Sequence, residues 1–240
     1  MDSPNPMNLF FSIYFLSCAT IGAIGNFLII CVTIMDKRLR NACNIFIAFL
    51  CVGDLLHELS EYTMVISSHI TWDHKLVQSD CFYYHFVPNI GFTLSGCSLL
   101  NIALDRLIAV STLKYQSFCN TKSYIFSHVA PSVIVSALLV IFGAFDVSNE
   151  ERVVCTIIGG FRETARTIQY QLATELVGGC FMNFGMAVNF IVYYLVNQDY
   201  RSALDKYFHF NRIFPCLKKI NNKVDYSTSL NIPVSGENRQ

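Results

Sequence analysis

Charged residues are scarce in this chain of 240 residues. Asp, Glu, Lys and Arg make up 14% of it, whereas 53% is hydrophobic and the mean hydropathy is +0.42. A soluble domain of this length cannot bury so much apolar surface, so the composition excludes an ordinary soluble globular protein. The formal net charge is zero and there is no block of Lys and Arg. We therefore expect no nucleic-acid partner.

The first apolar run lacks the features of a cleaved signal peptide. No Lys or Arg precedes Lys37, and the uncharged run from Leu9 to Met35 is longer than a signal-peptide core. We expect it to remain in the protein as a membrane span. The sequence also has no Asn-x-Ser/Thr sequon, so glycosylation gives no indication of which side faces outward.

Long apolar segments take up most of the chain. A membrane-spanning helix needs about 20 mainly apolar residues. Five segments are long enough, at about residues 9–35, 43–67, 83–110, 124–145 and 172–197. They predict an all-α fold, a polytopic membrane helix bundle with five spans.

The distribution of Lys and Arg predicts the orientation, because cytoplasmic loops retain positive charge. Thirteen of these residues follow the first, third and fifth spans, and four follow the second and fourth. This split predicts an integral membrane protein of the plasma membrane, with its N-terminus outside and its C-terminus in the cytoplasm.

Beyond the last span, apolar residues recur with helical spacing at Tyr200, Ala203, Leu204, Tyr207 and Phe208. This pattern predicts an amphipathic helix in the membrane interface over about residues 198–213. Cys216 follows it, and either palmitoylation or an ordinary free thiol fits this position. We expect residues 1–215 to form the transmembrane domain and residues 216–240, which are polar and unpatterned, to be a disordered cytoplasmic tail.

The second span carries an unusual stripe of titratable residues. An ionised Asp54 at membrane depth costs about 2.5 to 3.5 kcal/mol, so it must face the bundle interior. His57, Glu58 and Glu61 continue the same helix face. A proton-coupled transporter using Asp54, Glu58 and Glu61 is one interpretation. The favoured one places the extra groups near the outer mouth of the bundle, because no second charged cluster on another helix completes a proton relay.

Catalytic chemistry is disfavoured by the rest of the sequence. No nucleophile-base set, metal-ligand spacing or phosphate loop lies at membrane depth. We therefore expect no enzyme activity and no cofactor.

Several short motifs occupy informative places in this order of spans. Asp105-Arg106-Leu107 ends the third apolar run, Leu50-x-x-x-Asp54 lies in the second, and Asn189-x-x-x-Tyr193 lies in the last. Together with Asn26 in the first span and a pair of outer-loop cysteines, they make the chain resemble a rhodopsin-like G-protein-coupled receptor, of the nematode serpentine chemoreceptor type called Srsx. The resemblance covers spans one to four and seven, and helices five and six are missing.

The resemblance implies a role for residues at the cytoplasmic side. Asp105, Arg106 and Leu107 would form the G-protein coupling motif, in which Arg106 pairs with an acid at rest and turns to the G protein in the active state. Asn189 and Tyr193 would form the activation motif, with Phe190 where the family has proline. Losing that proline removes its kink.

The resemblance also implies two structural sites. Asn26, Asp54 and Asn189 would meet in a polar core, where Asp54 either binds sodium or joins a hydrogen-bond network without an ion. Cys81 and Cys155 would form a disulfide on the outer, oxidising side.

The function that the resemblance implies is chemosensory. Such a receptor would bind an extracellular small molecule or peptide, lie in membrane lipid and signal to a heterotrimeric G protein. Because helices five and six are missing, an alternative remains open, a truncated and non-signalling form that acts on full-length receptors, for example as a receptor dimer.

Overall fold

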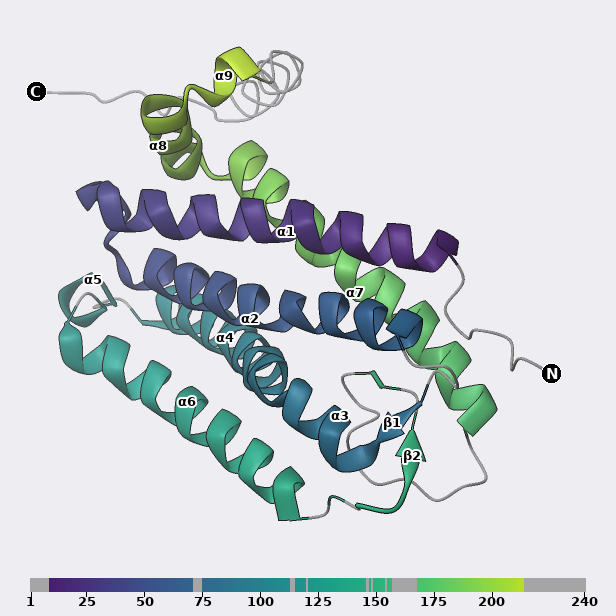
Figure 1. Cartoon of the computed structure of the whole chain (residues 1–240). Coiled ribbons are helices and arrows are strands. Elements are labelled where there is room, and N and C mark those ends of the chain that lie inside the picture. Colours follow the sequence, from purple (N-terminus) through teal and green to yellow (C-terminus); the bar gives the residue numbers. More distant parts are fainter. Residues whose placement is uncertain are drawn as a thin grey trace, which may run out of the picture. The chain divides into compact units, whose positions relative to one another are not determined.

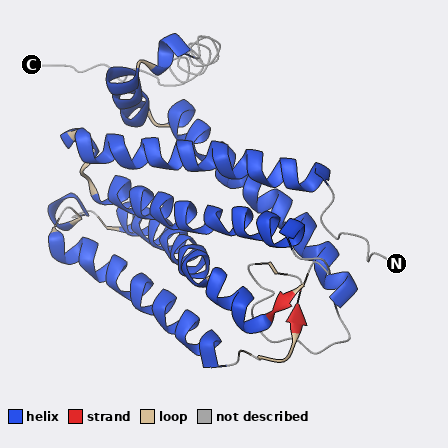
Figure 2. Cartoon of the chain, in the orientation of Figure 1, coloured by secondary structure: helices blue, strands red, loops and turns tan. Residues whose placement is uncertain are grey.

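The computed structural model describes residues 9–70, 75–112, 115–119, 121–145, 147, 149–153, 155–156 and 168–213. Figure 2 shows that helices dominate this part of the chain, beside one short pair of strands. The elements, all labelled in Figure 1 except η1, are α1 (Leu9–Met35), the 3₁₀ helix η1 (Lys37–Leu39), α2 (Ala42–Ile70), β1 (Leu76–Val77), α3 (Gln78–Tyr84), α4 (Phe86–Ser111), α5 (Tyr115–Phe118), α6 (Lys122–Phe145), β2 (Arg152–Val153), α7 (Ile168–Val196), α8 (Gln198–Phe208) and α9 (Phe210–Ile213).

Five helices in the described part of the chain are long and apolar enough to cross a membrane. The candidate spans are Leu9–Met35, Ala42–His69, Phe86–Ser111, Lys122–Phe145 and Gly178–Val196. They confirm the predicted all-α polytopic bundle. The third span begins at Phe86 rather than at residue 83, because the backbone at His85 (φ −95°, ψ 7°) leaves the helical region and separates α3 from α4.

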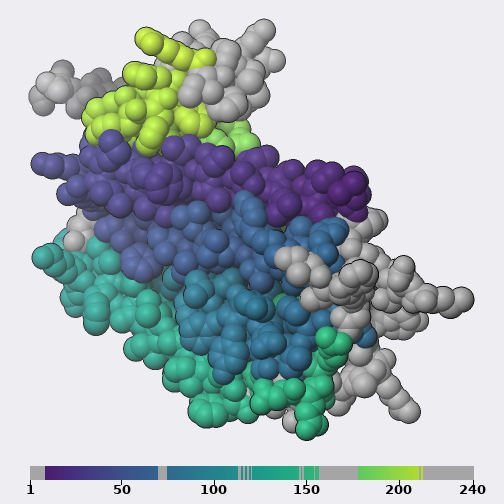
Figure 3. Space-filling model, in the orientation of Figure 1, coloured from purple at the N-terminus to yellow at the C-terminus, as the bar shows by residue number. Residues whose placement is uncertain are grey.

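The chain divides into two compact units, Met1–Ile191 and Val192–Gln240. In the first unit α2 is central, since it packs against both α1 and α4, and α4 packs in turn against α6 (Figure 1). Figure 3 shows the surfaces of α1 and α2 lying side by side. The residues that place polar side chains inside this unit therefore come mainly from α2 and its neighbours.

The backbones of α2 and α4 approach closely at two glycines. A Cβ atom on Gly91 of α4 would lie 2.6 Å from the carbonyl oxygen of Gly53 and 2.6 Å from the amide nitrogen of His57, both on α2. A Cβ atom on Gly96 of α4, in contrast, would have no neighbouring atom within 4 Å. Small residues allow such close packing between membrane helices, where hydrophobic burial alone gives little selectivity.

Large apolar side chains face outward as well as inward. Phe15, Met64 and Val65 form a buried cluster between α1 and α2. Phe142 and Val110, however, are 67% and 89% exposed. A water-soluble protein rarely exposes many such residues together, whereas surrounding lipid hydrocarbon accommodates them.

A small covalently closed structure lies beside α3. Strands β1 and β2 pair antiparallel, with Leu76 opposite Val153. A disulfide joins Cys81 of α3 to Cys155, which follows β2, with Cα atoms 5.4 Å apart. The disulfide implied by the sequence is thus confirmed, and it fastens the loop after α6 to the segment that precedes α4.

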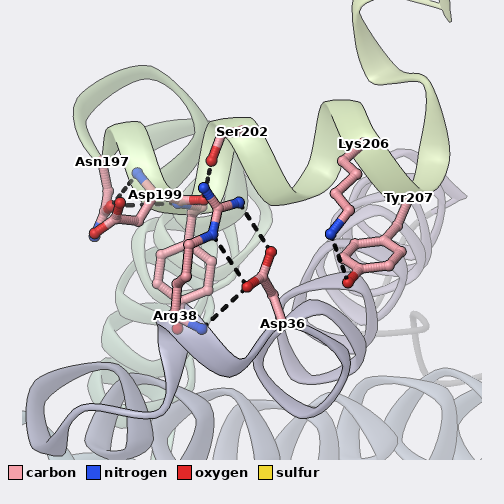
Figure 4. Close-up of polar contacts among 8 residues, drawn as sticks. Asp36, Arg38, Asn197, Asp199, Ser202, Lys206 and Tyr207 are labelled. Atoms are coloured by element: carbon pink, nitrogen blue, oxygen red, sulfur yellow. Dashed lines mark hydrogen bonds and ion pairs between the residues drawn. The ribbon is translucent and has the colours of Figure 1, made fainter.

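Figure 4 shows side chains that cap the first turns of two helices. At η1, the Asp36 carboxylate accepts hydrogen bonds from the Arg38 backbone N–H and, at 3.0 to 3.2 Å, from the Arg38 guanidinium. At α8, the side-chain oxygen of Asn197 accepts hydrogen bonds from the backbone N–H groups of Asp199 and Tyr200. Both side chains satisfy amide donors that the first turn of a helix leaves without partners.

The second unit contains the end of α7 together with α8 and α9. The amphipathic segment expected over residues 198–213 is two helices, because His209 adopts the left-handed conformation (φ 52°) and ends α8. Within this unit the Tyr194 hydroxyl donates to Asp205 at 3.0 Å. Cys216 and the expected tail over residues 216–240 lie outside the described residues.

Candidate functional site

The carboxylate of Asp54 lies at the junction of three helices of the first unit. The Ser95 hydroxyl of α4 donates to its Oδ1 at 2.7 Å, and the Asn189 amide of α7 donates to its Oδ2 at 3.4 Å. Asp54 is only 4% exposed. The structure therefore brings Asp54 and Asn189 together, and it adds Ser95, which sequence reasoning missed because a serine in a membrane helix is common.

Asn26 of α1, the third residue expected in this polar core, contacts a different acid. Its amide donates to Glu58 Oε1 at 3.2 Å, one helical turn beyond Asp54 along α2. Glu58 packs against Gly22 of α1, where a Cβ atom would collide with Glu58 Oε1. This glycine lets the Glu58 side chain approach α1, so Asn26 meets Glu58 instead of Asp54.

A second amide–carboxylate pair lies one turn further along α2. The Asn183 amide of α7 donates to Glu61 Oε1 at 2.8 Å and to the backbone oxygen of Gly179 at 2.9 Å. Asn183 was not identified from the sequence. The available signal was its position in an apolar run, six residues before Asn189, where a buried amide needs a partner.

The remaining member of the α2 stripe is His57, which is 5% exposed. Its ring lies 5.4 Å from the ring of Phe92 on α4, at a tilted angle of 45°. Asp54, His57, Glu58 and Glu61 are thus all buried inside the first unit, and they face three different neighbouring helices. The stripe of titratable residues on α2 therefore forms a polar layer that connects α1, α4 and α7.

Asp105 lies near the other end of α4, where three side chains hold its carboxylate. Arg106 reaches Oδ2 through Nε (3.1 Å) and Nη2 (2.5 Å), while Oδ1 accepts hydrogen bonds from the hydroxyls of Tyr115 (2.6 Å) and Tyr124 (3.1 Å). The Asp105 side chain is completely buried, but the Arg106 side chain is 53% exposed. Leu107, the third residue of the motif, is 64% exposed.

Tyr115 and Tyr124 were not predicted as members of this site. They come from α5 and α6, and only the path of the chain between α4 and α6 brings them to Asp105. Burial and the neighbouring Asp105 carboxylate raise the pKa of Tyr115, which lies outside the spans, well above its ordinary value. Its phenol therefore remains a hydrogen-bond donor throughout the physiological pH range.

Phe190 occupies the position at which the family motif has proline, and its side chain packs against Gly25 of α1. A Cβ atom on Gly25 would lie 2.6 to 2.8 Å from the Phe190 side chain. Tyr193, three residues further along α7, lies in the second unit, where its ring is 5.8 Å from that of Tyr200. Phe190, which replaces the proline of the family motif, thus forms a packing contact between α1 and α7.

Comparison of the sequence with known proteins found a matching family and several receptor relatives. Residues 19–177 match the family described as serpentine type 7TM GPCR chemoreceptor Srsx. Prokineticin receptor 2 is 30% identical over 142 residues in Bos taurus and over 145 in Homo sapiens, in each case covering 55% of this chain and 36% of the receptor. Melatonin receptor type 1A of Ovis aries is 29% identical over 107 residues, covering 43% of this chain and 29% of that receptor.

The matches have limited extent, since the chain spans about a third of the length of these relatives. The match to the family extends over more than half of the sequence. The chain belongs to the serpentine seven-transmembrane chemoreceptors of the Srsx type, a family of G-protein-coupled receptors.

Proposed function

We propose that this protein is a chemosensory receptor that binds an extracellular small molecule or peptide and signals to a heterotrimeric G protein through Asp105 and Arg106. The observation that supports coupling most directly is the contrast within that pair. Asp105 is fully buried and held by two tyrosines, whereas the guanidinium of Arg106 reaches the surface. Release from Asp105 leaves Arg106 able to contact a partner, while the Tyr115 and Tyr124 hydroxyls still donate to Asp105 Oδ1.

The proposal includes a membrane orientation. The N-terminus and the Cys81–Cys155 disulfide lie outside the plasma membrane, and the Asp105 end of α4 lies in the cytoplasm. Residues 1–215 form the receptor domain and residues 216–240 a cytoplasmic tail. Asp54, Asn189 and Ser95 act as the polar core of the receptor, with sodium at Asp54 as its candidate ligand.

Basal nucleotide exchange tests the coupling without a known ligand. Membranes containing the expressed chain are incubated with purified G-protein α subunits and a labelled, non-hydrolysable GTP analogue. D105N is expected to raise the basal exchange rate severalfold, because Arg106 loses its charged partner. R106A is expected to reduce it to the rate of empty membranes.

The chain offers a matched control for D105N. Asp36 and Arg38 also form a pair between a buried carboxylate and an exposed guanidinium, with side chains 5% and 60% exposed. D36N should leave the exchange rate unchanged. Equal rates in empty membranes, wild type and all variants would contradict coupling through Arg106.

A second function is favoured by the number of spans. The family is described as seven-transmembrane, and the described residues contain five candidate spans. The connection between α6 and α7, residues 146–167, is about the length of one span, whereas two spans and their loop need roughly 40 residues or more. A receptor with five spans could act on full-length receptors instead of signalling alone.

Co-expression distinguishes this second function from the first. A full-length Srsx receptor carrying an outer epitope is expressed with and without this chain, and its surface level is measured. A modulating partner lowers that level and co-purifies with the receptor, while basal exchange by the chain alone stays at background. An unchanged surface level would contradict this function.

A further inference from the structure

In each of the two amide–carboxylate pairs inside the first unit, the amide oxygen and one carboxylate oxygen have no hydrogen-bond partner. Asn26 donates its amide hydrogens to Glu58 Oε1, and Asn183 donates to Glu61 Oε1. The other oxygens of all four side chains, Asn26 Oδ1, Glu58 Oε2, Asn183 Oδ1 and Glu61 Oε2, are buried and have no hydrogen-bond partner. Buried acceptors without donors are costly, so four of them on neighbouring side chains need an explanation.

The four residues lie together along one stretch of α2. Glu58 and Glu61 lie on the same face, one turn apart, with Asn26 approaching from α1 and Asn183 from α7. All four side chains are at least nine-tenths buried, with exposures of 0%, 1%, 2% and 6% for Asn26, Glu58, Asn183 and Glu61. The Ser60 hydroxyl, which is also buried, donates to the Glu61 carboxylate.

Nothing positive in the described part of the chain balances the two carboxylates. No Lys or Arg forms an ion pair with either glutamate there, and the ion pairs identified join Arg38 to Asp36 and Arg106 to Asp105. Either a proton on each glutamate or a bound cation would supply the missing donor or positive charge, and the two alternatives differ in their response to added salt.

We propose that Glu58 and Glu61, with Asn26 and Asn183, form a binding site for a hard metal cation that is distinct from the Asp54, Ser95 and Asn189 cluster. Carboxylate and amide oxygens are the ligands that hard cations prefer. Sodium and calcium share this oxygen chemistry. The cation supplies positive charge to four acceptors that otherwise lack a donor, and it links α1, α2 and α7. This site goes beyond the proposed coupling to a G protein.

Thermal unfolding of the purified full-length chain in detergent tests the site. The protein is prepared in choline chloride, and NaCl or CaCl₂ is added at constant ionic strength while helical circular dichroism is followed. A cation that binds the folded state selectively raises Tm by roughly 5 to 10 °C at a hundredfold excess over its Kd. The arm that responds identifies the cation, and the absence of a response to both overturns the proposal.

Three variants locate the response. E58Q/E61Q keeps the side-chain shapes and removes both charges, and in a D54N background, which lacks the separately proposed sodium site at Asp54, it is expected to abolish the rise in Tm. E150Q/E151Q removes two exposed glutamates of the connection between α6 and β2 and should retain the full response. D54N should retain most of it. A response of the same size in D54N and in D54N/E58Q/E61Q overturns the proposal, and a response that disappears in D54N alone assigns the cation to Asp54.

A gentler variant decides the matter if E58Q/E61Q does not fold. N183L removes one of the four oxygens and no charge. A weaker cation response than that of the wild type supports the site, and an unchanged response overturns it. None of these readouts depends on G-protein coupling, so a failure of this proposal and a failure of receptor signalling are distinguishable.

Discussion

Buried carboxylates are treated in opposite ways in two regions of the first unit. At the end of α4, Asp105 has an arginine on one oxygen and two tyrosine hydroxyls on the other. In the middle of α2, Glu58 and Glu61 each have one amide donor and one oxygen without a partner. A fully satisfied carboxylate holds helices together, whereas an incompletely satisfied one costs free energy until a ligand completes it. The comparison therefore separates a carboxylate whose partners are all supplied by the chain from two carboxylates that each keep one oxygen without a partner.

The largest expected effect comes from the packing that positions α4 against α2. G91A places a methyl group 2.6 Å from backbone atoms of Gly53 and His57, which cannot move aside independently. Overpacking of this kind costs about 3 kcal/mol, which lowers Tm by roughly 6 to 12 °C. G96A on the same helix meets open space and should leave Tm unchanged. A similar Tm for the two variants would contradict the close approach of α2 and α4.

The next effect breaks the satisfied carboxylate. D105A leaves Arg106 without its ion pair and removes the acceptor of both tyrosine hydroxyls. Hydrogen bonds to charged groups contribute about 1.5 to 3 kcal/mol, and we expect Tm to fall by roughly 5 to 8 °C. D105N keeps an acceptor oxygen and should lose about half as much. Equal losses in D105A and D105N would show that the tyrosine hydrogen bonds contribute nothing measurable.

The same kind of change at Glu58 is expected to have the opposite sign. E58Q removes a buried charge and gives the side chain an amide that can donate to the free oxygen of Asn26. In choline chloride, without a hard cation, it should raise the stability by about 1 kcal/mol, or Tm by roughly 2 to 4 °C. E151Q, at an exposed position, is the control, and any change in its Tm should be smaller than that of E58Q. A fall in Tm for E58Q would show that the carboxylate is already satisfied.

Much of the fold was predictable because each span is specified by its own residues. A mainly apolar run of about 20 residues has few alternatives to a membrane helix, so the five spans followed from their lengths, even though Asp54, Glu58 and Glu61 interrupt the second. The break at His209, in contrast, depends on one backbone conformation that histidine rarely adopts. The short β1–β2 pair was not predicted either, since two strands of two residues carry no periodic signal.

Prediction of the sites was limited for a different reason. The Asp105–Arg106 pair joins neighbours in sequence, and the pairing of Cys81 with Cys155 was implied by the family resemblance, so both were identified before the structure. The partner of Asn26 depends on which turn of α2 faces α1, and Gly22 decides this by admitting Glu58. No pattern within either helix carries that information, because the choice arises only when two helices pack together.

The smallest expected effect separates the two tyrosines that hold Asp105. The Tyr115 hydroxyl is 2.6 Å from Oδ1 and the Tyr124 hydroxyl is 3.1 Å away. Y115F should therefore cost about 1 kcal/mol and Y124F less, and both costs should largely disappear in a D105A background, where the shared acceptor is gone. Thermal unfolding of the four single and double variants measures this coupling. Costs that persist unchanged in D105A would mean that the hydroxyls act through other contacts.

The pH dependence of Y115F refines this last comparison. Burial and Asp105 raise the pKa of Tyr115 above its ordinary value of about 10, so the folded chain keeps this proton at pH values where the unfolded chain releases it. Stability contributed by Tyr115 is thus complete below pH 10 and is lost as the pH rises toward the folded pKa. Y115F should lose less stability than the wild type between pH 9 and 11. An identical decline in both proteins would mean that Asp105 does not hold the Tyr115 phenol in its protonated form, and the carboxylate would then be less well satisfied than its geometry indicates.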